Sequence, residues 1–219
     1  MTSPAEIAQY SAFRQRMVEE QLRARSITDE RVLAAMLSVP RHEFAPDRCR
    51  DHAYADHPLP IDECQTISQP FIVALMLEAL TLSPADKVLE VGTGSGYVTA
   101  LLAELAAEVI SIERHASLAD SARQRLDAMG YRNVRIVVGD GSRGFPQSAP
   151  YHAILVSAAA AELPRELLDQ LAEGGRLIIP IGTAETQQLQ LVRKRNRELV
   201  ISPRELCRFV PLVSDNGRS

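Results

Sequence analysis

Lys87-Val88-Leu89-Glu90-Val91-Gly92-Thr93-Gly94-Ser95-Gly96-Tyr97 is the stretch that decides the fold of this chain. It begins as an apolar run of strand composition, passes through three alternate glycines, and leads into an Ala- and Leu-rich segment of helical length. Glycine lets backbone approach a ligand closely at the start of a helix, where a Cβ atom would obstruct it. The pattern predicts a strand, a tight turn and a helix, with a nucleoside-bearing cofactor at Gly92 and Gly94.

Two later carboxylates strengthen this interpretation. Glu113 ends a second apolar run and lies about 20 residues beyond Gly92, the spacing of an acid that accepts hydrogen bonds from ribose hydroxyls. Asp140 and Gly141 follow a third apolar run, 134–138. The carboxylate of Asp140 can accept a hydrogen bond from the exocyclic amine of a base, and the unobstructed amide of the neighbouring glycine can donate one to a ring nitrogen. Each acid alone is also consistent with a solvated strand end, but the series of three strand-end signals favours a binding site.

The spacing of the glycines indicates which cofactor binds. The dinucleotide fingerprint is G-x-G-x-x-G, which places a pyrophosphate, whereas this chain has G-x-G-x-G. A cofactor without a pyrophosphate fits better, and S-adenosylmethionine is the prediction. Glu90 agrees with it, because an amino-acid ammonium near the turn favours a nearby carboxylate.

Strands and helices alternate from residue 87 onward, which predicts a parallel sheet covered on both faces. The expected strands are 87–91, 109–113, 135–138, 153–157 and 176–180, and the expected helices are 97–107, 117–129 and 164–171. Segments 188–193 and 207–213 look like an antiparallel addition at one edge. Before the sheet, 4–37 reads as two helical pieces with Thr28 capping the second, and 70–80 reads as a helix.

The length of 219 residues suits one α/β domain. We expect residues 1–85 to form a helical and loop extension on the substrate side, 86–213 the cofactor-binding core with its edge strands, and 214–219 a tail.

Composition and charge argue against several classes of protein. The net charge of −4 does not suit nucleic-acid binding by bulk electrostatics, and the basic run 193–197 reads as a hairpin turn. No signal peptide or membrane span is expected. Three widely spaced cysteines suit a reducing cytoplasm. Cys49 and His52 have a metal-ligand spacing, but no second pair completes a site, so no metal is predicted.

A further block lies before the first sheet strand. Gln65-Thr66-Ile67-Ser68-Gln69-Pro70, set beside the glycine turn, Glu113 and Asp140-Gly141, resembles the protein-L-isoaspartate O-methyltransferases. The resemblance runs from about Met17 to Leu212 and includes Val39-Pro40-Arg41. The glycine turn is common to many methyltransferases, whereas the Q-T-I-S-Q-P block is specific to this family.

The resemblance implies a doubly wound, mostly parallel Rossmann-like sheet and a carboxyl methyltransferase that repairs proteins. It implies transfer of a methyl group from S-adenosylmethionine to the free α-carboxylate of L-isoaspartyl residues, leaving S-adenosylhomocysteine. It makes Ser68 the catalytic residue and residues 209–212 a strand on which the peptide substrate lies. With Glu90, which is predicted from its charge, the expected cofactor contacts are Thr66, Ile67, Ser68, Glu90, Gly92, Gly94, Glu113, Asp140 and Gly141.

The chemistry needs few catalytic groups. An α-carboxylate with a pKa of about 3.5–4 is ionised at neutral pH, so no general base is required. The Ser68 hydroxyl can hydrogen-bond this carboxylate just ahead of a helix whose free amides attract anions. The alternative for Ser68 is an ordinary helix cap with no substrate role.

One loop departs from the family. The usual P-I-G-x-G-Q-T-I-S is replaced by Pro60-Ile61-Asp62-Glu63-Cys64-Gln65, so both glycines are missing. We expect the loop to run differently, and its two acids to repel an anionic substrate. Cys64 is interpreted as a loop residue and not a nucleophile.

Two alternatives remain open at the level of sequence: a methyltransferase for another carboxylate, and a non-catalytic protein that keeps the fold. Nucleic-acid amino-methylation is disfavoured, because 156–160 lacks the Asn/Asp-Pro-Pro-aromatic block. Isoaspartyl proteins or peptides are the predicted partners, and no oligomeric state is predicted.

Overall fold

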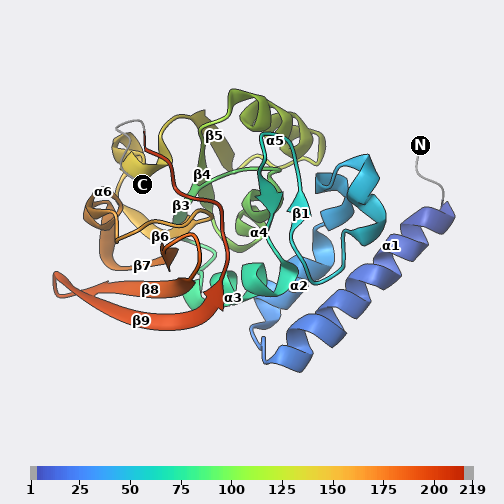
Figure 1. Cartoon of the computed structure of the whole chain (residues 1–219), viewed down its shortest axis with the longest axis horizontal. Helices are drawn as coiled ribbons and strands as arrows, with labels where there is room; N and C mark the ends of the chain where they lie inside the picture. Colours follow the sequence, from blue (N-terminus) through green and yellow to red (C-terminus); the bar gives the residue numbers. More distant parts are fainter. Residues whose placement is uncertain (1–3, 215–219) are drawn as a thin grey trace.

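The computed structural model describes residues 4–214 and is organised around a seven-stranded sheet of order β5-β4-β3-β6-β7-β8-β9 (Figure 1). The strands are β3 (Lys87–Val91), β4 (Glu108–Glu113), β5 (Val134–Val138), β6 (Tyr151–Val156), β7 (Leu171–Gly182), β8 (Gln187–Arg195) and β9 (Glu198–Cys207). Neighbours from β5 to β7 are parallel, and β7, β8 and β9 are antiparallel. The doubly wound, mostly parallel architecture expected from the sequence is confirmed.

The strand order reverses beside β3, which pairs with β4 on one side and with β6 on the other. The connections after β3 and β6 leave in opposite directions, so a crevice opens at the carboxyl ends of these strands. This topology fixes the place where a ligand is expected.

Helices cover both faces of the sheet (Figure 1). They are α3 (Pro70–Leu80), α4 (Tyr97–Leu105), α5 (Ala116–Ala128) and α6 (Arg165–Asp169). Alternate residues of β3 enter different apolar clusters: Val88 belongs to the cluster that includes α3 and α4, whereas Leu89 belongs to the cluster that includes Leu167 of α6. This alternation is the two-residue period of a strand buried on both faces.

The segment before the sheet is helical, as expected, and joins the same core. It consists of α1 (Pro4–Arg16), a π-helix (Met17–Leu22), a 3-10 turn (Arg23–Arg25) and α2 (Glu30–Ser38). The break falls at Ser26, whose φ is 68°. The expected cap Thr28 is wrong by one residue, because Asp29 accepts hydrogen bonds from the amides of Arg31 and Val32.

Short 3-10 turns lead from α2 to a two-stranded hairpin, β1 (Leu59–Pro60) and β2 (Thr66–Ile67). The turns are Arg41–Phe44 and Asp47–His52; further ones, Gly141–Arg143 and Pro146–Ser148, follow β5. The hairpin runs directly into α3 and carries residues 65–68 to the carboxyl ends of the sheet strands.

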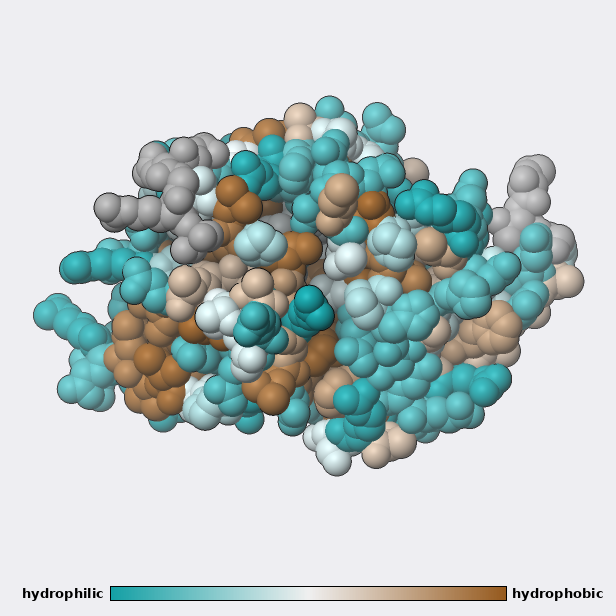
Figure 2. Space-filling model, in the orientation of Figure 1, coloured by the Kyte–Doolittle hydropathy of each residue, from teal (hydrophilic) through white to brown (hydrophobic). Residues whose placement is uncertain are grey.

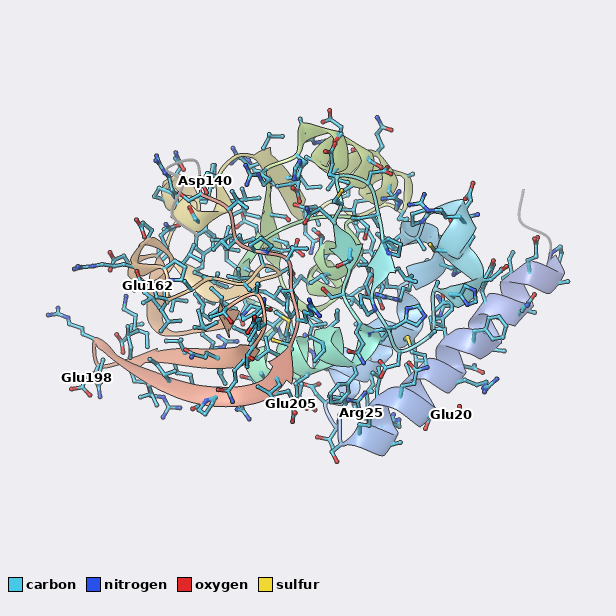
Figure 3. The ribbon with its side chains drawn as sticks, in the orientation of Figure 1. Glu20, Arg25, Asp140, Glu162, Glu198 and Glu205 are labelled. Atoms are coloured by element: carbon cyan, nitrogen blue, oxygen red, sulfur yellow. The ribbon has the colours of Figure 1, made fainter. Side chains whose placement is uncertain are left out.

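The edge of the sheet differs from expectation. The partner of β8 is Glu198–Cys207, not 207–213, and Glu198 and Glu205 mark its course in Figure 3. Residues 209–213 run instead beside Ala159, whose amide donates to the carbonyl of Val210 at 2.8 Å. The predicted strand at 209–212 is thus reduced to an isolated bridge between Ala159 and Pro211. The predicted tail beyond residue 214 lies outside the described residues.

Apolar side chains remain exposed on the outer strand. Leu199, Val200 and Ile201 are 41%, 52% and 49% exposed and form part of the brown area over the β8–β9 hairpin in Figure 2. Between residues 4 and 214, no helix has both the length and the apolar character needed to cross a bilayer.

Candidate active site

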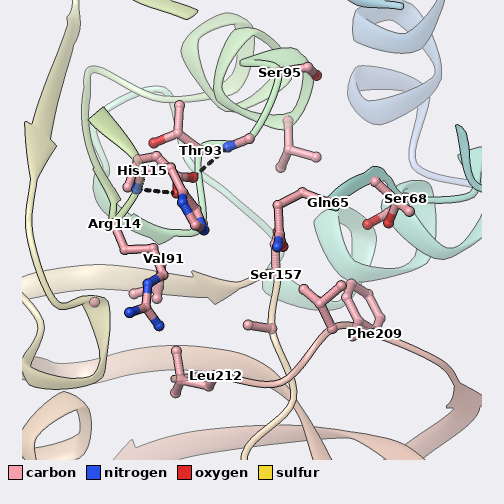
Figure 4. A pocket seen from close by; sticks show the side chains of 18 of the residues that line it. Gln65, Ser68, Val91, Thr93, Ser95, Arg114, His115, Ser157, Phe209 and Leu212 are labelled. Atoms are coloured by element: carbon pink, nitrogen blue, oxygen red, sulfur yellow. Dashed lines mark hydrogen bonds between the residues drawn. The ribbon is translucent and has the colours of Figure 1, made fainter. Parts of the chain in front are cut away.

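A cavity of about 840 Å³, counting its mouth, lies at the carboxyl ends of β3, β4 and β6. Its walls come from distant parts of the chain: residues 65–68, 91–95, 112–115, 157–158 and 209–213, with Tyr97, Val98 and Gly141. Figure 4 shows Ser68 and Phe209 toward one end and Arg114 and His115 toward the other, with Gln65 between them.

The glycine turn forms the floor of this cavity. Gly92 and Gly94 have φ values of 94° and 54°, in the region that residues with a Cβ atom rarely adopt. A Cβ at Gly92 would lie 3.4 Å from Cβ of Ser157, against the end of β6. Glycine is therefore favoured here by the backbone conformation, and a Cβ at Gly92 would still fit in ordinary contact with Ser157.

Glu113 lies at the end of β4, lines the cavity and is 5% exposed. Its Oε2 accepts from the amide of Gly94 at 2.9 Å and its Oε1 from the amide of His115 at 3.0 Å, drawn as dashed lines in Figure 4. Each carboxylate oxygen retains a second lone pair. The carboxylate is thus fixed in place with acceptor capacity for a ligand.

Asp140 and Gly141 are separated by the structure. Gly141 lines the cavity, and a Cβ there would come within 2.5 Å of Val91 Cγ1. Asp140 is not part of the lining, because its Oδ1 caps the next turn and accepts from the amide of Ser142 at 2.9 Å and from its hydroxyl at 2.6 Å. The prediction that Asp140 binds an amine stays a prediction.

The structure places Glu90 outside the cavity lining, so its expected role in cofactor binding stays a prediction. Glu90 is fully buried, and its Oε2 accepts from Thr99 Oγ1 at 2.5 Å and from Ser111 Oγ at 2.6 Å. Burial raises the pKa of this carboxyl to about 8, although both hydroxyls act to lower it. Glu90 does not line the cavity and supports the turn from within the core.

Ser68 lines the cavity between β2 and α3, and it does not cap the helix. The N-cap is Gln69, and Asp56 Oδ1 accepts from the amide of Phe71 in the first turn. In the described part of the chain, the Ser68 hydroxyl has no hydrogen-bond partner. The alternative interpretation of Ser68 as a helix cap is therefore wrong.

Arg41 holds this segment from behind. Its side chain is fully buried and donates from Nη2 to the Ser68 carbonyl at 2.8 Å and from Nε to the Ala53 carbonyl at 2.7 Å. Its guanidinium lies 4.8 Å from the ring centroid of Tyr97, which begins α4 beside the glycine turn. Burial lowers the pKa of Arg41. The Val39-Pro40-Arg41 segment thus positions the backbone of Ser68.

The unusual loop lies outside the cavity. Asp62, Glu63 and Cys64 do not line it, and the Glu63 carboxylate is turned toward the start of α5. The expectation that Asp62 and Glu63 repel an incoming substrate stays a prediction. The backbone of this loop is left-handed at two residues that carry a Cβ atom: Glu63 and Cys64 have φ values of 56° and 55°.

Several lining residues were missed by the analysis of the sequence. Ser157 follows β6 at the same edge of the sheet as Glu113 and Gly92, so the rule that found Glu113 also identifies this position. His115 and Arg114 carry no motif, and only their place after β4 brings them to the cavity.

The parallel sheet with its reversed strand order, the glycine floor and the strand-end carboxylate together define the Rossmann-like methyltransferase class. The sequence model described as protein-L-isoaspartate(D-aspartate) O-methyltransferase matches residues 12–217. The chain belongs to the protein-L-isoaspartate O-methyltransferase family, which confirms the resemblance noted in the sequence.

Individual relatives agree. A protein-L-isoaspartate O-methyltransferase of Koribacter versatilis is 52% identical over all of this chain and 99% of its own length, and one of Methanoculleus marisnigri is 54% identical over 93% of each. Among solved structures, a protein-L-isoaspartate O-methyltransferase superposes with a TM-score of 0.83 at 30% identity, over 94% of this chain and 67% of its own. A Plasmodium falciparum protein described as such an enzyme, in complex with S-adenosyl-L-homocysteine, has a TM-score of 0.79 at 30% identity, over 90% and 96%.

Proposed function

We propose that this protein transfers the methyl group of S-adenosylmethionine to the free α-carboxylate of L-isoaspartyl residues in damaged proteins and peptides. The observation that carries the proposal is the cavity in which Ser68, with an unpartnered hydroxyl, shares one space with the glycine floor and Glu113. Membership of the family supports the same reaction.

The residues present fit the cofactor. Glu113 would accept hydrogen bonds from the ribose hydroxyls, and Gly92 and Gly94 would admit the ligand close to the backbone. Thr66 and Ile67 would form the opposite wall. When bound, S-adenosylmethionine supplies an electrophilic methyl group on a positively charged sulfur.

The substrate side needs orientation and not proton transfer. A carboxylate oxygen forms the new bond to carbon as the carbon–sulfur bond breaks, so the negative charge of the acid and the positive charge of the sulfonium are both cancelled. Ser68 would orient the carboxylate through its hydroxyl, and residues 209–213 would contact the peptide. Holding the reacting atoms in line and excluding water are the main contributions expected from the protein.

The alternative of another carboxylate substrate rested on the loop of Asp62, Glu63 and Cys64, and these residues lie outside the cavity lining.

The reducing cytoplasm as the place of action stays a prediction from the sequence. The three cysteines are free thiols in the structure.

The test is methyl incorporation from labelled S-adenosylmethionine into two peptides that differ only in an isoaspartyl or an aspartyl linkage. We expect incorporation into the isoaspartyl peptide alone. Equal labelling of both peptides would favour a different carboxylate substrate. Tight binding of S-adenosylhomocysteine without labelling of either peptide would favour the alternative that this protein keeps the fold but is not catalytic.

A further inference from the structure

Glu63, at the tip of the β1–β2 hairpin, makes contacts that the proposed reaction does not explain. Its Oε1 accepts a hydrogen bond from Ser117 Oγ at 2.6 Å, and its Oε2 lies 3.6 Å from His115 Nδ1. Both partners belong to the start of α5, on the other side of the cavity mouth. A short bond from a hydroxyl to a carboxylate is a strong one for a partly exposed site, so Ser117 is the main partner.

The hairpin is shaped to present this side chain. The amide of Gln65 donates to the Asp62 carbonyl at 3.1 Å, closing a turn whose central residues, Glu63 and Cys64, both have positive φ. Residues with a Cβ atom adopt this conformation only when other contacts compensate for its cost. The bond from Ser117 to Glu63 is such a contact, and it gives the turn its orientation.

The two ends of this contact belong to different parts of the wall of the cofactor cavity. The hairpin carries Gln65 and continues to Ser68, whereas His115 donates its amide to Glu113 at 3.0 Å. Figure 4 shows Gln65 and His115 entering the cavity from these two parts of the wall. The hairpin also reaches the glycine floor, because Ile61 Cδ1 lies 3.6 Å from the place of a Cβ at Gly94.

We propose that Glu63 is a positioning residue that latches the β1–β2 hairpin to α5 and so holds the cofactor cavity closed. A cofactor that touches both parts of the wall binds only the closed arrangement fully. Any free energy that favours this arrangement before binding therefore appears as higher affinity and slower release. The inference rests on the cofactor assignment within the proposed function and is independent of which carboxylate is methylated.

Calorimetry with S-adenosylhomocysteine tests the latch on the full chain. We expect Glu63→Ala and Ser117→Ala each to weaken binding about three- to tenfold, because a charge-assisted hydrogen bond at a partly exposed site is lost. The double variant is expected to be no weaker than either single one, since both remove the same bond. Asp62→Ala is the matched control: it removes an exposed acid from the same turn and should bind as the wild type does.

Two further measurements separate a latch from a structural residue. Glu63→Gln keeps an acceptor for Ser117 and should recover affinity to within about twofold of the wild type. Amide hydrogen exchange in residues 59–68 should quicken in Glu63→Ala without ligand, while the melting temperature stays close to that of Asp62→Ala.

Three results would overturn the inference: equal affinity in Glu63→Ala and Asp62→Ala, additive losses in the double variant, or a loss of affinity that follows only a lower melting temperature. Because the readout is ligand binding, failure of the latch leaves methyl incorporation into the isoaspartyl peptide intact, whereas failure of the proposed function removes that incorporation.

Discussion

The carboxyl of Glu90 couples the stability of the core to pH. Burial raises its pKa from 4.5 to about 8. Between these values the folded chain keeps a proton that the unfolded chain releases. The free energy of unfolding therefore falls as the pH rises through this window, by at most about 1.4 kcal/mol per pH unit, and the contribution is constant below and above it.

Glu90→Gln should remove this dependence, because an amide is neutral at every pH. We expect the melting temperature of the variant, relative to the wild type, to improve steadily from pH 5 to pH 8. Thermal unfolding at four pH values measures the difference. Glu108→Gln, at the exposed start of β4, is the control and should run parallel to the wild type. If the melting temperature of Glu90→Gln also followed that of the wild type at every pH, the pKa of Glu90 in the folded chain would be an ordinary one.

Ser68→Ala tests the catalytic assignment. Loss of one positioned hydrogen-bond donor at an anion-stabilising site costs about 10²–10³ in rate. Since the Ser68 side chain does not cap α3, we expect the melting temperature to stay within error of the wild type and the affinity for S-adenosylhomocysteine to stay within a few-fold of it. Steady-state kinetics on the isoaspartyl peptide, with a melting curve, measure both. A fall in activity matched by a fall in melting temperature would make the role of Ser68 structural.

At the level of elements, the sequence predicts best where burial is strongest. The runs of β3 and β4 are apolar because both faces of these strands are covered, and their ends fall within a residue of expectation. β9 was missed because Ser202-Pro203-Arg204-Glu205 reads as a loop. The first half of β9, with Leu199, Val200 and Ile201, has strand composition. An edge strand exposed on most of its length tolerates polar residues and a proline, so the second half of β9 carries no strand signal.

The β1–β2 turn carries a prediction of its own. Cys64 has a φ of 55° and no part in the bond between Glu63 and Ser117. Cys64→Gly should remove the cost of the left-handed conformation, which is about 1–2 kcal/mol. The greater conformational freedom of glycine in the unfolded chain opposes this gain by about 0.5–1 kcal/mol. We expect a small net gain in the free energy of unfolding, measured by chemical denaturation, with cofactor affinity unchanged. Lower stability in this variant would show that the thiol side chain makes a packing contribution larger than the strain.

Across the whole molecule, the site was predictable in its backbone and less so in its side chains. Strand ends fix where Gly92, Glu113 and Gly141 lie, so topology brings them together. Whether an acid faces the cavity depends on partners distant in sequence. Glu90 shares a face of β3 with Val88, and on that face Thr99 and Ser111 donate hydrogen bonds to it; these partners are distant in sequence.

Because the cavity walls come from six separated segments, ligand binding should stabilise the whole fold. At a concentration 100 times its dissociation constant, S-adenosylhomocysteine should add about 2.7 kcal/mol. For a chain of this length that corresponds to a rise of about 5–10 °C in melting temperature. Differential scanning fluorimetry measures the rise.

Glu113→Ala is the matched variant for this measurement. Loss of the charged acceptor should cost about 1.5–3 kcal/mol of binding free energy and remove more than half of the rise at the same ligand concentration. Glu108→Ala, at the other end of β4, should keep the full rise. An undiminished rise in Glu113→Ala would exclude this carboxylate from the site.

One wall of the cavity consists of residues 209–213, held by Ala159 from the loop after β6. These residues are translated after every strand of the seven-stranded sheet. At about 5–20 residues per second, earlier strands can pair while this segment is still unmade. A nascent chain therefore has a sheet before it has a complete binding site, and it becomes competent for its cofactor only after residues 209–213 have left the ribosome.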